Sequence, residues 1–332
     1  MAPPISKQLE IHVGFLPGRK RGRALTRLAT TVLAATLLGT TAGTAVADTP
    51  AAPVPAPLKN ADKVKSTAPG ASKAPKGRMG YAAPGEVGAP FFPFSGVDRS
   101  GDLYMQESNG SGFDARDYRW FGWDVFKAAQ RVDHNKDGYE EGLYTWDFNG
   151  NLFYSDFTLD EAETRLIGGG WNVYDKVLSP GDLGGAKESD IMAVDKSGVL
   201  YVYLAHPDGK VTPRIKIGAG WGAYSQIAGQ GDLTGDGRTD LVARDKAGVL
   251  WLYKGTGNPK APFAARQKVG AGWNAYNYLF STGDVDRDGN ADLLARTAGG
   301  ELMLYKGTGN ARAPYAKPVK VGWGYQTYRL MF

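Results

Sequence analysis

Short strand-like runs of apolar residues, each introduced by a glycine, recur along residues 81–332. They begin at Gly101-Asp102-Leu103, Gly150-Asn151-Leu152, Gly198-Val199-Leu200, Gly248-Val249-Leu250 and Gly300-Glu301-Leu302. Short apolar runs bounded by turn residues are typical of β-strands, and no segment sustains the 3.6-residue period of a helix. The pattern therefore predicts an all-β protein.

The runs repeat with a period near 50 residues, because their leucines are separated by 49, 48, 50 and 52 residues. A second anchor, a Gly-Trp pair, places tryptophans at Trp123, Trp171, Trp221, Trp273 and Trp323. Two anchors that hold one period over five copies indicate a propeller or a repeat array. The best preserved copy has strand-like segments at 276–281, 292–296, 301–306 and 317–321. Each copy thus predicts a blade of four antiparallel strands, and the whole predicts a five-bladed β-propeller.

The two ends of the repeat region complement each other. The first copy opens at 91–97, which corresponds to the second strand of a blade, so its first strand is missing. Residues 325–332 correspond to a first strand that lacks the rest of its blade. We expect the C-terminal strand to complete the N-terminal blade, because closure removes free sheet edges. An open solenoid is the alternative, and it would expose a terminal strand at each end.

Acidic turns separate the first and second strands of three copies. In 284–292, oxygen-bearing side chains stand at positions 1, 3, 5 and 9 and a glycine at position 6, and the loops 133–141 and 232–240 repeat this spacing. Calcium takes hard oxygen ligands that alternate along a tight loop, and the glycine permits the bend. The sequence therefore predicts a structural calcium ion in each loop. The candidate ligands, with a backbone carbonyl at position 7, are Asp133, Asn135, Asp137, Tyr139 and Glu141; Asp232, Thr234, Asp236, Arg238 and Asp240; and Asp284, Asp286, Asp288, Asn290 and Asp292.

A fourth loop, 182–190, has no ligand at positions 3 and 5, and we expect it to bind no ion. A plainer interpretation of all these loops is that they are Asx and glycine turns with hydrated carboxylates.

Residues 1–47 have the features of an export signal. A basic stretch at 19–23 precedes an apolar stretch at 25–44, and Ala45-Val46-Ala47 forms a small-residue cleavage site. Residues 48–80 are rich in Ala, Pro and Lys and predict a disordered linker, which leaves the propeller at 81–332. We expect a secreted protein, free or associated with the cell wall, with no membrane span after cleavage. An uncleaved membrane anchor is the alternative.

The composition limits the cross-links, metal sites and partners that we expect. The 332 residues include no Cys and three His, which excludes disulfides and argues against a histidine zinc site. The formal net charge of +5 is carried by residues 1–47, which hold six Lys or Arg and one Glu. Because the repeat region is acidic, we expect no nucleic-acid partner. We also expect a monomer.

Two families resemble this repeat. The pattern Gly-Asp-x-Asp/Thr-x-Asp-Gly-x-x-Asp-Leu, followed by Arg and a Gly-Leu-Tyr strand, resembles the FG-GAP (VCBS-type) repeats of integrin-like propellers. The segment 270–280 and the C-terminal 323–332 resemble the tachylectin family, although Tyr replaces Phe in its motif and tachylectin blades lack acidic loops. Together the resemblances cover about 81–332. Tachylectins are five-bladed propellers that bind N-acetylated sugars between blades.

The tachylectin resemblance implies sugar sites at the Gly-Trp turns, where an aromatic ring would stack on a pyranose. The implied residues are Trp171, Asn172, Tyr174, Trp221, Tyr224, Trp273, Asn274, Tyr276 and Trp323. The alternative is that these Trp and Tyr side chains pack between blades.

We expect no catalytic activity. No Gly-x-Ser-x-Gly nucleophile motif is present, and most Asp residues belong to the repeated loops. His134 lies inside an acidic loop and His206 precedes Pro207, where surface residues are commoner than catalytic bases. Because Asp and Glu are abundant, a glycosidase-type carboxylate pair stays open.

Two functions follow. The first is a lectin-like module for N-acetylated sugars or cell-wall glycans, whose several weak sites would gain from multivalency. The alternative is an extracellular protein-interaction propeller, for example a modulator of a secreted protease. The irregular segments 114–120 and 156–165 would then carry the binding surface. A calcium-dependent hydrolase is a third hypothesis.

Overall fold

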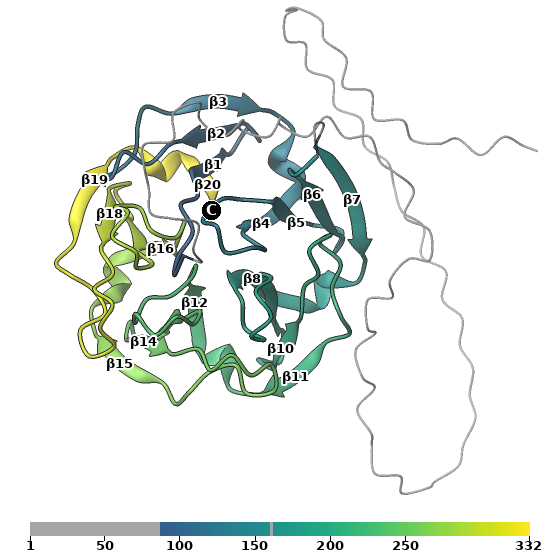
Figure 1. The fold of residues 1–332 in the computed structure, drawn as a ribbon. Coiled ribbons are helices and arrows are strands. Elements are labelled where there is room, and N and C mark those ends of the chain that lie inside the picture. The colour runs from purple at the N-terminus through teal and green to yellow at the C-terminus, as the bar shows by residue number, and fades with distance from the viewer. Residues whose placement is uncertain (1–86, 160–161) are drawn as a thin grey trace, which may run out of the picture. The chain divides into compact units, whose positions relative to one another are not determined.

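Five four-stranded sheets form a ring (Figure 1), and their first strands line a central channel. They are seen in a computed structural model that describes residues 87–159 and 162–332. The predicted export signal, 1–47, and linker, 48–80, lie outside these residues. Within the described part, the helical elements are five single 3-10 turns of three residues each. The predicted all-β, five-bladed propeller is confirmed.

Each blade is an antiparallel meander whose first strand lines the channel and whose fourth strand lies outside (Figure 1). Blade 1 contains β20 (Tyr328–Met331), β1 (Phe94–Asp98), β2 (Leu103–Gln106) and β3 (Asp117–Trp120). Blade 2 contains β4 (Phe126–Val132), β5 (Gly142–Asp147), β6 (Leu152–Asp156) and β7 (Glu163–Gly168). Blade 3 contains β8 (Tyr174–Gly181), β9 (Asp190–Asp195), β10 (Leu200–Tyr203) and β11 (Ile215–Gly218). Blade 4 contains β12 (Tyr224–Ala228), β13 (Leu241–Asp245), β14 (Leu250–Tyr253) and β15 (Gln267–Gly270). Blade 5 contains β16 (Tyr276–Phe280), β17 (Leu293–Thr297), β18 (Leu302–Tyr305) and β19 (Val319–Gly322).

The ring closes as predicted, by the C-terminal strand. β20 pairs antiparallel with β1, so that Met331 faces Gly96. Phe332 extends the pairing, since its N–H and C=O bond Ser95 at 3.0 and 2.7 Å. Arg329 of β20 also donates to the Phe126 carbonyl at 2.8 Å, which ties blade 1 to blade 2. One strand therefore completes one blade and attaches it to the next.

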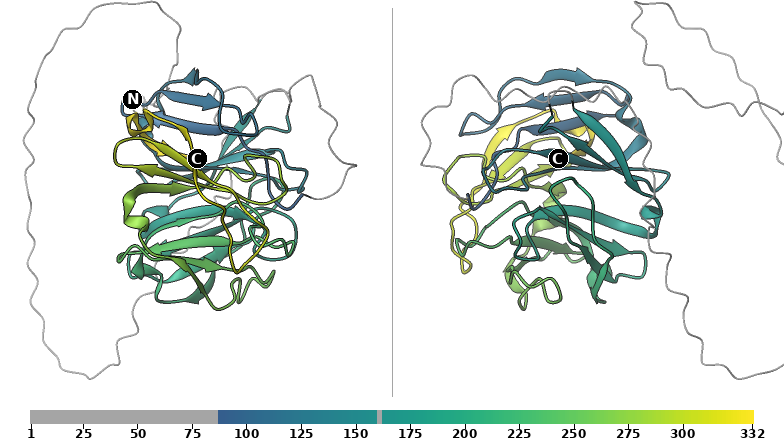
Figure 2. Two further views of the ribbon diagram at one scale, coloured as in Figure 1. Left: turned by 90° about the vertical axis from the view of Figure 1, so that its left-hand side faces the viewer. Right: turned by 45° about the vertical axis from the view of Figure 1, so that its right-hand side comes forward.

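The strands run between two opposite faces of the ring, so their connections gather on these faces (Figure 2). The loops between first and second strands, which include the acidic loops, lie on one face, here called the loop face. The turns between second and third strands and the 3-10 turns lie on the other, the turn face.

A left-handed glycine precedes each 3-10 turn. The turns are η1 (Trp123–Val125), η2 (Trp171–Val173), η3 (Trp221–Ala223), η4 (Trp273–Ala275) and η5 (Tyr325–Thr327). Their preceding glycines have φ between 81° and 103°, which a residue with a Cβ adopts only under strain. This requirement explains the recurrent Gly-Trp pair.

The prediction of Trp323 as the fifth anchor residue is wrong, because the 3-10 turn begins two residues later, at Tyr325. Gly324 and Tyr325 occupy the positions that glycine and tryptophan hold in the other turns. Tyr325 is buried, whereas Trp323 is 81% exposed. Trp323 fits the repeat period, but the glycine with the left-handed conformation that precedes the turn is Gly324.

The core consists of clusters between neighbouring blades. Arginines add polar links between blades. Arg296 of blade 5 donates to the carbonyls of Tyr325 and Tyr328 at 2.9 and 2.7 Å, and Arg244 of blade 4 donates to that of Trp273 at 2.9 Å. Because these guanidinium groups are buried, each satisfies carbonyls that would otherwise lose their hydrogen bonds.

Candidate functional site

Acidic loops stand in register on the loop face of blades 2 to 5. They span 133–141, 182–190, 232–240 and 284–292, and each joins the first strand of its blade to the second. Blade 1 has no such loop, because its first and second strands come from opposite ends of the described chain. The repeated connection therefore presents its side chains at corresponding points of the ring.

The aspartate at position 1 shapes its loop. Asp232 Oδ1 accepts the N–H of Thr234 and Gly235 at 2.9 and 2.8 Å, and its Oδ2 accepts that of Gly237 at 2.6 Å. Asp133 accepts three amides of its own loop in the same way. These bonds curl the backbone around the carboxylate, so that the following side chains turn inward.

The residue at position 9 fastens the loop to its blade. Asp240 accepts the N–H of Leu233 at 3.1 Å and, from the connection after the third strand, that of Gly255 at 2.8 Å. Asp190 accepts the equivalent bond from the N–H of Ala205 at 2.8 Å, although its loop lacks ligands at positions 3 and 5. Position 9 thus has a structural role that does not depend on a metal.

Three loops bring carboxylates together. In each, one oxygen from every member lies within 4.8 Å of the others, a geometry that could hold a metal ion. The groups are Asp133, Asp137 and Glu141; Asp232, Asp236 and Asp240; and Asp284, Asp286 and Asp292. Positions 1, 5 and 9 converge in the first two loops, and positions 1, 3 and 9 in the third.

Two oxygens at position 3 are buried without a hydrogen-bond partner, Thr234 Oγ1 and Asp286 Oδ1. The Thr234 residue is only 8% exposed and the Asp286 side chain 9%. A buried polar atom without a partner costs roughly 1–3 kcal/mol. A cation bound in either loop would supply the missing partner.

Burial opposes ionisation of these carboxyl groups. It raises the pKa of Asp133, Asp240 and Asp284 to about 6, and that of Glu141 and Asp292 to about 7. Desolvation is the largest cause in each group, and neighbouring carboxylates add to the rise in pKa. Ionised carboxylates in these clusters are therefore costly unless a positive charge compensates them.

Lysine ammonium groups compensate part of the negative charge of these carboxylates. Lys254 Nζ lies 2.9 Å from Asp236 Oδ2, and Lys306 Nζ lies 2.9 Å from Asp286 Oδ2. In the fourth loop, Asp182 pairs with Lys136 at 3.1 Å. Lys187 occupies the position where the other loops have glycine, and its φ of 121° is unusual for a residue with a side chain. The fourth loop thus differs from the others in both charge and backbone.

The remaining predicted ligands make other contacts or offer only their carbonyls. Asn135 donates to Glu141 Oε1 at 2.6 Å, and Asp288 Oδ1 accepts the N–H of Asn290 at 2.9 Å. The Tyr139 ring packs edge-on against Phe91, with centroids 6.2 Å apart. Tyr139, Arg238 and Asn290 stay predictions, because their proposed contribution is the backbone carbonyl of position 7.

An N-terminal segment, 87–92, joins the three loops that contain carboxylate clusters. Val87 and Phe91 donate to the carbonyls of Lys136 and Gly138, both at 2.8 Å. The carbonyls of Gly88 and Pro90 accept the N–H of Asp232 and Asp284 at 2.7 and 2.8 Å. Sequence analysis missed this contact, because the segment carries no pattern beyond a short apolar composition.

The tryptophans of the proposed sugar sites are buried between blades. Trp171, Trp221 and Trp273 are 1%, 8% and 7% exposed. Each indole centroid lies 4.7 Å from the ring of a tyrosine on a third strand, Tyr203, Tyr253 or Tyr305. Those tyrosines hydrogen-bond Tyr174, Tyr224 and Tyr276 through their hydroxyls. Interblade packing therefore accounts for the recurrence of these rings, while Asn172, Asn274 and Trp323 are exposed.

The channel holds a cavity of about 340 Å³, lined by the first strands of all five blades. Its walls are mainly apolar, with Lys127, Asp175 and Lys176 among the lining residues. Gln130 Nε2 donates to Gln230 Oε1 at 2.8 Å, which links blade 2 to the end of the first strand of blade 4.

Comparison with known proteins agrees with a repeat propeller. Residues 232–295, which contain two of the clustered loops, match the model of the FG-GAP-like repeat family. A search of curated protein sequences returned no match. Resemblance to tachylectins received no support. A propeller with FG-GAP-like repeats suggests a binding or protein-interaction role and is generally non-enzymatic.

Among solved structures, similar chains include two described as putative 6-phosphogluconolactonases. That of Bacteroides fragilis is 13% identical with a TM-score of 0.36, and the alignment covers 72% of this chain and 69% of that one. That of Bacteroides uniformis is 12% identical with a TM-score of 0.36, covering 68% and 70%. The WD40 domain of SCAP from fission yeast is 10% identical with a TM-score of 0.34, covering 70% and 50%.

Among the described residues, no helix has the length and apolar character needed to cross a membrane.

Proposed function

We propose that this chain is a secreted, calcium-stabilised propeller that binds an extracellular protein. The observation that carries the calcium assignment is the convergence of three carboxylates in each of three corresponding loops. Secretion is supported by the export-signal features of residues 1–47. Binding is supported by the propeller scaffold and its FG-GAP-like repeat.

Donor chemistry favours calcium over other cations. The clusters offer carboxylate oxygens, with a hydroxyl at Thr234 and a carbonyl at position 7, and no sulfur. All-oxygen sites suit calcium, which accepts irregular geometry and six to eight ligands, whereas magnesium demands a near-ideal octahedron. Extracellular calcium modules bind at about 0.1–1 mM.

Isothermal titration of the mature protein tests the calcium assignment. We expect three ions per chain, one for each cluster. Asp236→Asn and Asp286→Asn should each abolish one site, because each removes a charge from a cluster. Glu188→Gln is the matched control and should leave the stoichiometry unchanged, since it removes one charge from loop 182–190, which lacks a cluster. Absence of binding at about 10 mM calcium, well above the usual range, would contradict the assignment.

A protein partner is favoured over carbohydrate because the repeated indole rings are covered. A pyranose stacks on an accessible aromatic face, and Trp171, Trp221 and Trp273 offer none. The polar residues beside them, Asn172 and Asn274, are exposed but lack an accessible ring next to them.

Carbohydrate binding at Trp323 is the second candidate, favoured by the 81% exposure of its ring. If this ring binds sugar, glycan-array signals with N-acetylated sugars should disappear in Trp323→Ala. Asn274→Ala serves as the comparison, because it tests the motif beside a buried indole. A signal that is lost in Asn274→Ala but retained in Trp323→Ala would place the sugar at the buried motif instead. Absence of any signal would remove this candidate.

A further inference from the structure

We propose that the turn face of blade 2 docks a protein segment in which apolar side chains are flanked by acidic residues. This inference rests on the proposed protein-binding function and deepens it. The surface consists of Phe121, Val125 and Phe148, and is here called the apolar corner. These residues are 54%, 51% and 64% exposed.

The residues of the apolar corner belong to neighbouring segments on the rim of the turn face. Phe148, in the turn between β5 and β6, donates its N–H to the carbonyl of Val125 at 3.1 Å. Val125 ends η1, and Phe121 precedes the glycine that begins this turn. The same contact recurs one blade later, where Lys196 donates to Val173 at 3.3 Å. Turns and 3-10 segments therefore alternate around the rim, and the apolar residues occupy adjacent places in it.

The other blades show that the fold does not require these side chains. At the place of Phe121, two residues before the first residue of the 3-10 turn, blades 3, 4 and 5 have Gly169, Ala219 and Ala271, and the turn before β20 has Trp323. At the place of Val125 blades 4 and 5 have Ala223 and Ala275, whereas blade 3 also has a valine, Val173. At the place of Phe148 blades 3 and 4 have Lys196 and Lys246. Among the described blades, blade 2 alone has large apolar residues at all three places, and such a group of exposed apolar side chains points to a binding surface.

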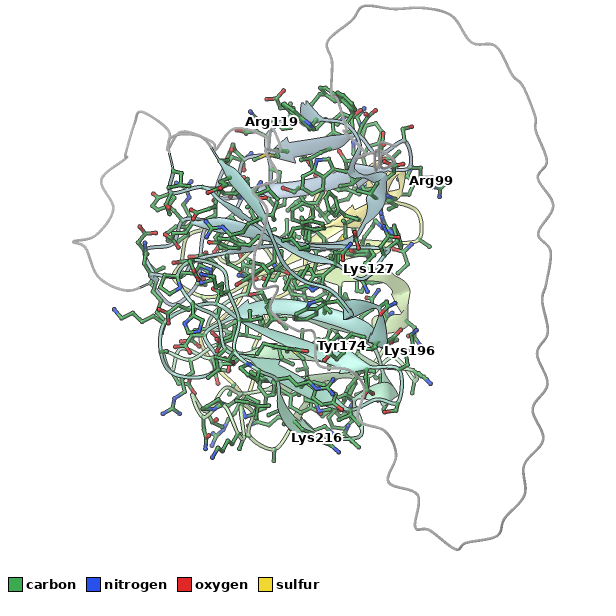
Figure 3. All side chains as sticks on the ribbon, turned by 90° about the vertical axis from the view of Figure 1, so that its right-hand side faces the viewer. Arg99, Arg119, Lys127, Tyr174, Lys196 and Lys216 are labelled. Atoms are coloured by element: carbon green, nitrogen blue, oxygen red, sulfur yellow. The ribbon has the colours of Figure 1, made fainter. Side chains whose placement is uncertain are left out.

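Basic residues lie on both sides of the apolar corner. Arg99 occupies the corresponding turn of blade 1 and Lys196 that of blade 3, and both are exposed. Lys127 follows η1 and donates to the carbonyl of Trp171 at 3.2 Å. Figure 3 shows Arg99, Lys127 and Lys196 on the same side of the ring. Among the described residues, neither Arg99 nor Lys196 forms an ion pair, so an acidic partner could pair with both.

Charge also favours a protein over an anionic membrane. Asp124 and Asp175 are exposed on the same rim, between and beside the basic residues. A uniformly anionic surface would be repelled by these carboxylates, whereas a peptide can place its charges to avoid them. The corner directly follows the predicted binding segment 114–120, whose last four residues form β3.

Peptide selection tests this surface. A phage-displayed library of random peptides is selected against the immobilised, calcium-loaded protein. We expect enriched sequences that combine Phe, Leu or Trp with neighbouring Asp or Glu. The triple variant Phe121→Ala, Val125→Ala, Phe148→Lys gives blade 2 side chains that other blades already tolerate. We expect it to bind the selected peptides at least about tenfold more weakly, because aromatic anchors carry most interface energy.

The controls separate this surface from the rest of the molecule. Trp323→Ala removes another exposed aromatic residue of the turn face and should leave binding unchanged. Arg99→Glu with Lys196→Glu should weaken binding of the acidic peptides, and low salt should strengthen it in the parent protein.

Several results would overturn the proposal. If selected peptides bind the triple variant with unchanged affinity, the docking surface is elsewhere, although the proposed protein-binding function survives. Absence of any enriched peptide would reject the surface together with that function. Binding to phosphatidylserine vesicles that is lost in the triple variant would assign the corner to a membrane. Dimerisation in sedimentation that is lost in this variant would assign it to a second copy of the chain.

Discussion

Deleting Tyr328–Phe332 should unfold the ring at ambient temperature. The deletion removes β20, which leaves the inner edge of β1 unpaired and exposes the blade 1 side of two interblade clusters. Tyr328, Leu330, Met331 and Phe332 are all buried, and each contributes about 1.5–3 kcal/mol. Their sum is comparable to the total stability of a typical domain, about 5–15 kcal/mol.

Circular dichroism and thermal unfolding measure this loss. We expect the truncated chain to show no cooperative transition, or one lowered by tens of degrees. Trp323→Ala is the control, because an exposed side chain outside the core should change stability by no more than about 0.5 kcal/mol. An unchanged transition in the truncated protein would mean that β20 does not close the ring.

The second large effect is a dependence of calcium-free stability on pH. Without calcium, we expect the protein to be more stable at pH 5 than at pH 7.5. The pKa of Asp133, Asp240 and Asp284 is raised to about 6, and that of Glu141 and Asp292 to about 7, by burial. A carboxyl group whose pKa is higher in the folded state favours folding when protonated, and this advantage disappears as pH rises through 6 and 7.

One group acts in the opposite direction. Burial lowers the pKa of His134 to about 4, so protonation below its ordinary value of 6.5 favours the unfolded chain. Burial also raises the pKa of Asp190 to about 7, so six carboxyl groups oppose one histidine, and we expect the net change to follow the carboxylates.

Calcium should reverse this dependence. At about 10 mM calcium and a dissociation constant of about 0.1–1 mM, each site adds roughly 1.4–2.7 kcal/mol. Because the ion needs deprotonated ligands, the increase in melting temperature should be large at pH 7.5 and small at pH 5. Differential scanning calorimetry at both pH values, with EDTA or calcium, measures this. Equal shifts at both pH values would show that the clustered carboxylates are not the ligands.

The repeat period allowed the architecture to be predicted from sequence, because every blade must present a glycine and a strand at corresponding places. Closure was predictable for the same reason, since a first copy without its first strand needs one from elsewhere. The residue that anchors the last copy could not be predicted from sequence, because Trp323 and Tyr325 are both aromatic residues that follow a glycine. Only the left-handed backbone of Gly324 distinguishes them.

The candidate site was predictable in its outline but not in its contacts. Spacing identified the three loops, and the structure brings positions 1 and 9 together in each. Position 3 is Asn135 or Thr234 in the first two loops, so a carboxylate at this position is available only in the third, where Asp286 rather than Asp288 completes the cluster. The partners Lys254 and Lys306 come from a distant connection, so local spacing could not reveal them.

The burial of Trp171, Trp221 and Trp273 also depended on three-dimensional context. A Gly-Trp turn has the same sequence whether its indole points to solvent or into the interface. The rings of Tyr203, Tyr253 and Tyr305 decide the outcome by covering one face of each indole.

Crystals of the mature protein grown with calcium, measured at a wavelength where calcium scatters anomalously, test the central claim most directly. We expect anomalous peaks in the loops 133–141, 232–240 and 284–292, each within about 2.3–2.6 Å of carboxylate oxygens, and none in the loop 182–190. Empty clusters at calcium concentrations well above 1 mM, or a peak in the loop 182–190 instead, would contradict a calcium-stabilised ring.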